Sequence, residues 1–278
     1  MDGESAEFHC SQPLSFGSLF AGIGGFDLGF ERAGMVCKWQ VEIDDYANRV
    51  LSKHWPNVRR WPDVRTWPQP DTERVDVICG GFPCQDISYA GQGAGLDGSR
   101  SGLFFEAIRV VCELRPKVVV LENVAALLVR GLDRVLGTLA ENGYDAQWTC
   151  LSAKEFGAPH KRERVFVVAY PNEARLFVPG QPSSRTNRKP SYGESGLESE
   201  EHGSEWWRIE PGLGRVVDGL SDELDEDRRC KRIGSLGNAV VPQVAEWIGR
   251  RIVETAGRMP VSCVVNAPNT GAAKKDRR

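Results

Sequence analysis

Short apolar runs alternate with amphipathic segments along roughly the first 170 residues of the chain. Most of the runs are continuous and rich in β-branched residues, which is typical of buried strands. The segments between them carry apolar residues at helical spacing. The pattern predicts strands over residues 14–20, 36–42, 75–79, 117–121, 144–151 and 165–169, and helices over residues 25–33, 44–54, 103–115, 131–142 and 241–256.

This alternation predicts an α/β fold, in which a mostly parallel sheet is covered by helices on both faces. The pattern changes at Pro171, after which the chain is rich in Ser, Gly, Pro, Glu and Arg and shows little periodicity. We therefore predict four parts: a main domain over residues 1–169, a small loop-rich region over 170–232, a helical segment over 233–258, and a disordered tail over 259–278.

The composition excludes several classes of protein. With 41% apolar and 26% charged residues among 278, the chain has the make-up of an ordinary globular protein. It contains no apolar run of eighteen residues, and its first twelve residues are acidic and polar, so we expect no membrane association, no signal peptide and a cytoplasmic location. Its eight cysteines form no C-x-x-C pair, so we expect no metal site.

The net charge of −3 is mild evidence against a nucleic-acid partner, although a local basic cleft is sufficient for binding. Two basic runs, residues 160–164 and 228–232, are candidates for such a cleft.

A glycine-rich turn, Phe20-Ala-Gly-Ile-Gly-Gly25, joins the first predicted strand to the first predicted helix. Asp27 occupies the third position of a G-x-G-x-x-G motif and disfavours pyrophosphate, whereas a cationic nucleoside such as S-adenosylmethionine (AdoMet) fits better. Glu42 ends the next strand, where a carboxylate can accept hydrogen bonds from ribose hydroxyls. Asp63 is placed to accept from an adenine amine. A turn with solvated acids is the alternative, and the turn alone does not decide between them.

Two neighbouring strand ends carry a thiol and a carboxylate. Cys84 follows a buried strand in the stretch Cys-Gly-Gly-Phe-Pro-Cys, and Glu122 ends the apolar run that begins at Lys117. Ligands of open α/β sheets bind at this edge. A thiolate and a protonated carboxyl suit conjugate addition to a pyrimidine, and burial supplies the raised pKa that the acid needs. Alone, Cys84 could be an inert loop cysteine, and Asn123 could cap the next helix.

Together these stretches resemble the C5-cytosine DNA methyltransferase family in its short prokaryotic and phage-like form. Residues 20–25 are similar to the cofactor motif of the family, 81–85 to its catalytic motif, and 122–124 to its acid motif. Residues 158–164 are similar to its Q-x-R-x-R segment, and 237–242 to its final motif, whose helix returns to complete the cofactor pocket. The motifs occur in the order of the family, from residue 16 to about residue 252.

The resemblance implies a Rossmann-like AdoMet-binding sheet, a methyl group transferred to C5 of a cytosine flipped out of duplex DNA, and a covalent adduct between Cys84 and C6. It implies the catalytic residues Cys84, Glu122, Arg162 and Arg164. Arg162 and Arg164 would contact the flipped base or its phosphate and orient Glu122. The cofactor-binding residues expected are Phe20, Ala21, Gly22, Gly24, Gly25, Glu42, Ile43, Asp63, Val64, Gly80, Pro83, Leu103, Asn238 and Ala239.

The resemblance also implies roles for two loops and for partners. Residues 85–100, with four glycines, are expected to form a lid over the DNA, and residues 170–232 a target-recognition region. Arg175, Arg185, Arg188 and Lys189 are the candidate DNA contacts there, unless this region is a solvated linker, and Trp206 and Trp207 are expected to form a small core. We expect a monomer that acts on double-stranded DNA, with a cognate restriction endonuclease as a further partner.

The sequence departs from the family pattern at two positions. Ile43 stands where relatives often stack an aromatic ring on adenine, and His160 replaces the glutamine of Q-x-R-x-R. Three alternative functions remain: a non-catalytic DNA-binding relative, a C5-pyrimidine enzyme that acts on free nucleotides, and transfer of a group other than methyl. The intact Cys84, Glu122, Arg162 and Arg164 argue against the first, and the extra loop-rich region argues against the second.

Overall fold

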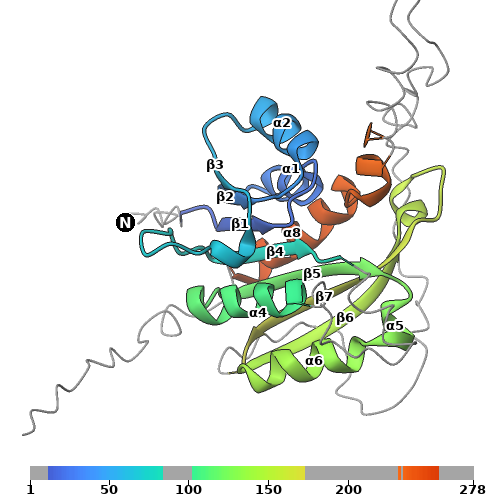
Figure 1. Cartoon of the computed structure of the whole chain (residues 1–278). Helices are drawn as coiled ribbons and strands as arrows, with labels where there is room; N and C mark the ends of the chain where they lie inside the picture. The colour runs from blue at the N-terminus through green and yellow to red at the C-terminus, as the bar shows by residue number, and fades with distance from the viewer. Residues whose placement is uncertain (1–11, 84–101, 173–230, 233, 257–278) are drawn as a thin grey trace, which may run out of the picture.

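The computed structural model describes residues 12–83, 102–172, 231–232 and 234–256. These residues form a sheet with the strand order β3-β2-β1-β4-β5-β7-β6 (Figure 1). The strands are β1 (Ser15–Leu19), β2 (Val36–Val41), β3 (Arg59–Trp61), β4 (Val77–Gly81), β5 (Val118–Val124), β6 (Tyr144–Ser152) and β7 (Glu163–Pro171).

The sheet is mostly parallel, as the sequence predicts. Strands β1 to β5 pair in parallel, and β7 alone runs antiparallel to both of its neighbours, β5 and β6. The carboxyl ends of β1, β2, β4 and β5 therefore lie along one edge. This edge is where an open α/β sheet binds its ligands.

Helices cover both faces of the sheet (Figure 1). On one face, α4 and α6 contribute Phe104, Ile108 and Leu139 to a core that includes Ile78 and Val119. On the other face, α1 and α8 contribute Phe30 and Ile248 to a second core that includes Phe16 and Val120. The helices are α1 (Gly25–Arg32), α2 (Asp45–His54), α4 (Gly102–Leu114), α5 (Leu127–Arg130), α6 (Leu132–Glu141) and α8 (Pro242–Ala256), with the short 3-10 helices η1 (Val64–Thr66) and η3 (Ala153–Phe156).

The structure extends several predicted strands. The apolar run of β5 ends at Leu121, but the strand continues to Val124 because β7 pairs with it as far as Arg164. Backbone pairing across the sheet thus extends a strand through polar residues that a hydrophobic pattern leaves out. The interpretation of Asn123 as a helix cap is wrong, because Asn123 lies within β5 and Ala126 is the N-cap of α5.

Several predictions concern residues outside the described ranges. These are the 85–100 loop, almost all of the 170–232 region with its candidate DNA contacts, and the tail after residue 258. Within the described residues, no helix is both long and apolar enough to cross a membrane.

Asp27 does not face the glycine-rich turn, so its interpretation as a ligand-selecting charge is wrong. The carboxylate is fully buried and accepts hydrogen bonds from Gln40 Nε2 at 2.7 Å and from Ser18 Oγ at 3.1 Å. Arg60 in turn donates to Gln40 Oε1 at 3.2 Å. Burial raises the pKa of Asp27 to about 6, although these hydrogen bonds oppose the shift.

The raised pKa of Asp27 predicts a pH-dependent cost to stability. Between about pH 4 and pH 6 the folded chain binds a proton that the unfolded chain has released, so stability falls as pH rises through this window. A change from 3.8 to about 6 corresponds to about 3 kcal/mol. Asp27→Asn retains an acceptor for Gln40 and cannot ionise. Urea unfolding should therefore show the variant gaining up to about 3 kcal/mol over wild type from pH 4 to pH 7. A difference independent of pH would contradict this account.

Candidate active site

A cavity of about 730 Å³ opens at the carboxyl edge of the sheet. Its walls come from the turn after β1, the ends of β2, β4 and β5, the 3-10 helix η1, and the segment 231–239 that precedes α8. Predicted site residues from all of these elements meet there: Phe20, Gly22, Glu42, Ile43, Asp63, Val64, Pro83, Leu103, Glu122, Arg164, Asn238 and Ala239.

Among the residues that the structure describes, five predicted site residues do not line this cavity: Ala21, Gly24, Gly25, Gly80 and Arg162. The three glycines allow close packing instead. A Cβ atom on Gly24 would meet the Trp55 ring at 2.4 Å, one on Gly25 the Val240 carbonyl oxygen at 2.2 Å, and one on Gly80 the Leu19 carbonyl oxygen at 2.7 Å. These glycines therefore shape the turn and its support, while Gly22, with φ +56°, faces the cavity.

Glu42 joins the two loops that form the base of the cavity. Its side chain accepts hydrogen bonds from the backbone N–H groups of Gly22 at 2.7 Å and Asp44 at 2.8 Å. The residue is only 9% exposed. A carboxylate fixed by two backbone donors retains lone pairs for a ligand and is rigidly oriented.

The adenine-side candidates differ in their surroundings. Both oxygens of Asp63 accept from the Arg65 guanidinium, and this hydrogen bonding lowers the pKa of Asp63. Asp63 also caps η1 through the backbone N–H of Arg65. Ile43 is 66% exposed at the cavity wall and so offers an apolar surface to a ligand.

Glu122 is a buried acid at the end of the cavity nearest β7. It is 6% exposed, and its Oε1 accepts from Arg164 Nε at 3.1 Å. Burial raises the pKa of Glu122 to about 7, while the positive charges of Arg164 and Arg162 oppose the shift. Gly81 lies beside Glu122 in the β4–β5 register, and a Cβ atom there would come within 2.8 Å of Glu122 Oε2. The carboxyl therefore depends on the glycine for its space, and it can exist in either protonation state near pH 7.

Asn123 anchors the chain that leads to the predicted nucleophile. Its Nδ2 donates to the Phe82 carbonyl at 3.0 Å, and the side chain is buried. Phe82 itself packs in the core, and Pro83 is the last described residue before the gap. Cys84 lies outside the described residues.

Arg162 holds the segment before α8 rather than reaching into the cavity. Its two terminal nitrogens donate to the carbonyl oxygens of Gly237 at 2.6 Å and Ala239 at 2.5 Å. Its backbone has φ +33°, which a non-glycine residue rarely adopts, and burial lowers the pKa of the guanidinium. Because Asn238 and Ala239 line the cavity, Arg162, the residue just before β7, ties the start of that strand to this part of the cavity wall.

The described cysteines are poor candidates for a nucleophile. Cys37 and Cys79 are buried, and Cys112 and Cys150 are partly buried. Burial raises the pKa of all four thiols, which suppresses the reactive thiolate form. Among the described residues, no group of three or more His, Cys, Asp or Glu side chains is arranged to hold a metal ion.

Sequence reasoning missed some residues of the cavity wall. Asp44, Asn123, Lys231 and Ser235 line it alongside the predicted set. The adjacency of Asn123 to Glu122 was a usable signal, because the same strand end carries both. Lys231 belongs to the basic run 228–232 that the sequence offered as a cleft, whereas Ser235 carried no signal of its own.

Comparison with known proteins identifies the family to which this chain is similar. The model of the C-5 cytosine-specific DNA methylase family matches residues 14–209. The type II methyltransferase M.NgoBI of Neisseria gonorrhoeae is 34% identical over 253 residues, which are 90% of this chain and 73% of that protein. M.HhaI of Haemophilus parahaemolyticus is 35% identical over 59% of this chain and 51% of its own length. M.Eco47II of Escherichia coli is 40% identical, but only 39% of it is matched.

The chain thus spans about half or less of some of these relatives and most of another. A solved structure, a mutant DNMT2 of Spodoptera frugiperda, superposes with a TM-score of 0.51 at 21% identity, covering 63% of this chain and 54% of that one. That likeness supports the Rossmann-like fold. The family model covers well over half of the sequence, and the ordered motifs converge on one cavity. The chain belongs to the C-5 cytosine-specific DNA methylase family.

Proposed function

We propose that this protein transfers a methyl group from AdoMet to C5 of cytosine in duplex DNA, with Cys84 as the nucleophile. The observation that carries the proposal is the buried Glu122 carboxyl beside Gly81. Cys84 follows Gly81 by three residues, so its Cα lies at most about 11 Å from that of Gly81. Chain connectivity thus allows the thiol to reach a base held against Glu122.

The cavity has features that suit AdoMet. Its volume of about 730 Å³ is within the range of about 300–1,000 Å³ that small-ligand pockets occupy. Glu42 offers a fixed carboxylate for the ribose, Ile43 and Val64 offer apolar surface for the adenine, and Gly22 allows close approach of the backbone. When bound, AdoMet supplies an electrophilic methyl group.

The Glu42 carboxylate gives a direct test of the cofactor assignment. Glu42→Ala removes the acceptor of two backbone N–H groups and the proposed acceptor of the ribose hydroxyls. AdoMet binding should weaken by about 2 kcal/mol, the scale of hydrogen bonds to a charged group, which is roughly a 30-fold rise in Kd. Asp45→Ala, which removes an exposed carboxylate from the start of α2, is the matched control. Calorimetric titrations that give equal affinities for the Glu42 and Asp45 variants would remove Glu42 from the site.

Cys84 and Glu122 are proposed to act directly on the cytosine ring. The Cys84 thiolate forms a bond to C6, and the electron pair of the C5–C6 double bond moves toward C5 and the N3–C2 carbonyl system. Glu122 in its protonated form donates to N3 and stabilises that charge. After C5 is methylated, a base removes the C5 proton, the double bond re-forms, and the thiolate leaves C6. Arg164 holds the Glu122 carboxyl in place throughout.

A duplex hides C5 and C6 of cytosine, so we also propose that the target base rotates out of the helix. Residues 170–232 are proposed to choose the target sequence, because side chains at base edges are needed for specificity and the motif residues proposed to carry the chemistry lie elsewhere in the chain. The relatives named type II methyltransferases suggest a cognate restriction endonuclease as a partner.

One assay separates this function from its rivals. The full chain is incubated with tritiated AdoMet and either mixed-sequence duplex DNA or dCTP, and the DNA is then sequenced after bisulfite treatment. Tritium in DNA only, at cytosines within one sequence context, is the expected result. Tritium in dCTP would assign a free-nucleotide enzyme, and DNA binding without label in either acceptor would assign a non-catalytic relative.

A further inference from the structure

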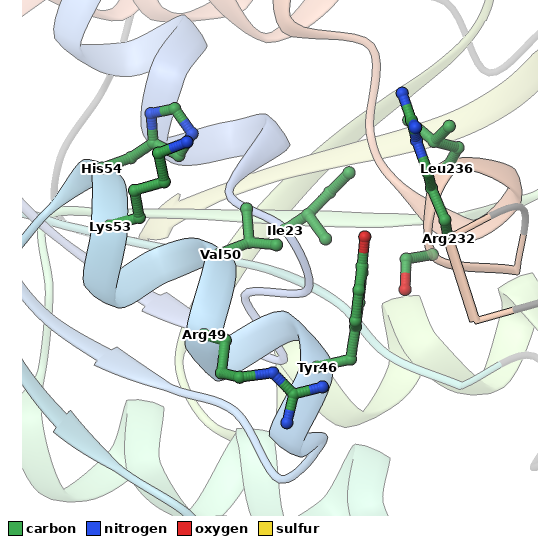
Figure 2. A pocket seen from close by; sticks show the side chains of 9 residues that line it. Ile23, Tyr46, Arg49, Val50, Lys53, His54, Arg232 and Leu236 are labelled. Carbon is green, nitrogen blue, oxygen red and sulfur yellow. The ribbon is translucent and has the colours of Figure 1, made fainter. Parts of the chain in front are cut away.

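A second cavity, of about 470 Å³, lies between α2 and the segment that precedes α8 (Figure 2). One wall consists of side chains from α2, and the other consists of Arg232, Ser235 and Leu236. Ile23 of the glycine-rich turn lies between the two walls. The lining residues are Ile23, Tyr46, Arg49, Val50, Lys53, His54, Arg232, Ser235 and Leu236.

The charged side chains that line this cavity are all basic. Arg49, Lys53 and Arg232 are cationic, and the lining set contains no carboxylate. Some basic residues elsewhere on the described surface do pair with acids, as Arg109 does with Glu106 and Glu113. Within the described ranges, Arg49, Lys53 and Arg232 form no ion pair. Three cations gathered without a counter-charge repel one another, so an anionic ligand gains from all three.

The base of the cavity is apolar. Ile23 and Val50 lie between the cationic groups, and Leu236 is 51% exposed there. Tyr46 points its ring into the same space, and the Arg49 guanidinium lies over that ring at 5.7 Å (Figure 2). A fully hydrated inorganic anion would leave this surface bare, whereas a ligand with both phosphate and carbon-rich parts covers it. The sugar-phosphate backbone of a nucleic acid has that composition.

The second cavity adjoins the active site. Ser235 lines both cavities, so the segment 231–239 forms a wall shared between them. Arg162 fixes the far end of that segment through Gly237 and Ala239. A phosphate held by Arg232 would therefore contact the same segment that encloses the cofactor cavity.

We propose that this second cavity binds the sugar-phosphate backbone of the DNA substrate, away from the target base. The inference rests on the proposed function. The chain as a whole carries a charge of −3, so its attraction to DNA has to come from local basic surfaces. This cavity is such a surface, and it is continuous with the wall of the active site.

The test is the salt dependence of DNA binding by the full chain. The variants are Lys53→Gln and Arg232→Gln, one from each wall, and the two combined. Arg74→Gln is the matched control, because Arg74 is exposed, forms no ion pair within the described ranges and precedes β4 at the opposite edge of the sheet. Loss of each phosphate contact lowers the magnitude of the slope of log Kobs against log salt concentration by about 0.9. We expect this decrease in each single variant, about 1.8 in the double variant, and none in Arg74→Gln.

Methyl transfer at saturating DNA should stay within about twofold of wild type in all of these variants, because the lost contacts bind phosphate in the ground and transition states alike. If the wild-type protein methylates DNA but the slopes of the Lys53 and Arg232 variants equal that of Arg74→Gln, this inference alone is overturned. If the variants have slopes equal to that of Arg74→Gln and also a lower Tm than wild type, the cavity would instead bind the acidic stretch 218–227 of the chain itself. That result would also overturn the inference. A wild-type protein that does not methylate DNA would overturn the proposed function first.

Discussion

Replacing Cys84 with serine is expected to abolish methyl transfer while DNA and AdoMet binding persist. An alcohol is far less ionised than a thiol near neutral pH, so the alkoxide needed to attack C6 is almost absent. The substitution changes one atom and removes little volume, so the fold should be retained. The measurement is the rate of tritium transfer from AdoMet to duplex DNA, together with Kd values for both ligands.

The chain offers a matched control for this substitution. Cys150 on β6 is a partly buried thiol, and burial raises its pKa. Cys150→Ser should keep wild-type turnover. Near wild-type turnover in Cys84→Ser, or loss of activity in both variants alike, would contradict the assignment of Cys84 as the nucleophile.

Glu122→Gln is expected to slow methyl transfer by about 10²-fold or more, the usual scale for a positioned proton donor. The amide has nearly the shape of the carboxyl and can still accept from Arg164, so AdoMet affinity should be unchanged. Measured kcat and cofactor Kd separate these two effects. An unchanged kcat with a collapse of cofactor affinity would place Glu122 in the cofactor site instead.

The pH profile gives a second readout of Glu122. Its pKa of about 7 means that the protonated form, which donates to N3, is progressively lost as pH rises through 7. Wild-type kcat should therefore fall on the alkaline side of about pH 7. The residual activity of Glu122→Gln should lack this decline. A decline of equal size in both proteins would assign the titration to another group.

The sequence predicted much of the sheet because its strands are continuous apolar runs separated by amphipathic helices. It also placed Glu122 and Glu42 at strand ends, since residues that end parallel strands share one edge of the sheet. The cavity contains both. The antiparallel direction of β7 was not predictable in this way, because a hydrophobic run carries no information about strand direction.

Interactions between segments far apart in the chain could not be predicted from the sequence either. Arg162 was expected beside the base, but its partners, Gly237 and Ala239, lie about 75 residues further along the chain. Asp27 was expected at the turn, but helix α1 directs it toward Gln40 and Ser18 in the core. Spacing identifies the type of residue in a motif, whereas the direction of a side chain depends on how the elements pack.

The central claim, that Cys84 attacks C6 of a cytosine in DNA, is tested most directly by trapping the adduct. Duplex DNA of mixed sequence, with every cytosine replaced by 5-fluorocytosine, is incubated with the full chain and AdoMet. Fluorine at C5 cannot leave as a proton does, so the thiol cannot be eliminated after methylation and the complex stays covalent. Peptide mass spectrometry should find the nucleotide on Cys84, with one added methyl group, only when AdoMet is present. A methylating enzyme that yields no adduct, or one attached to another residue, would contradict the account.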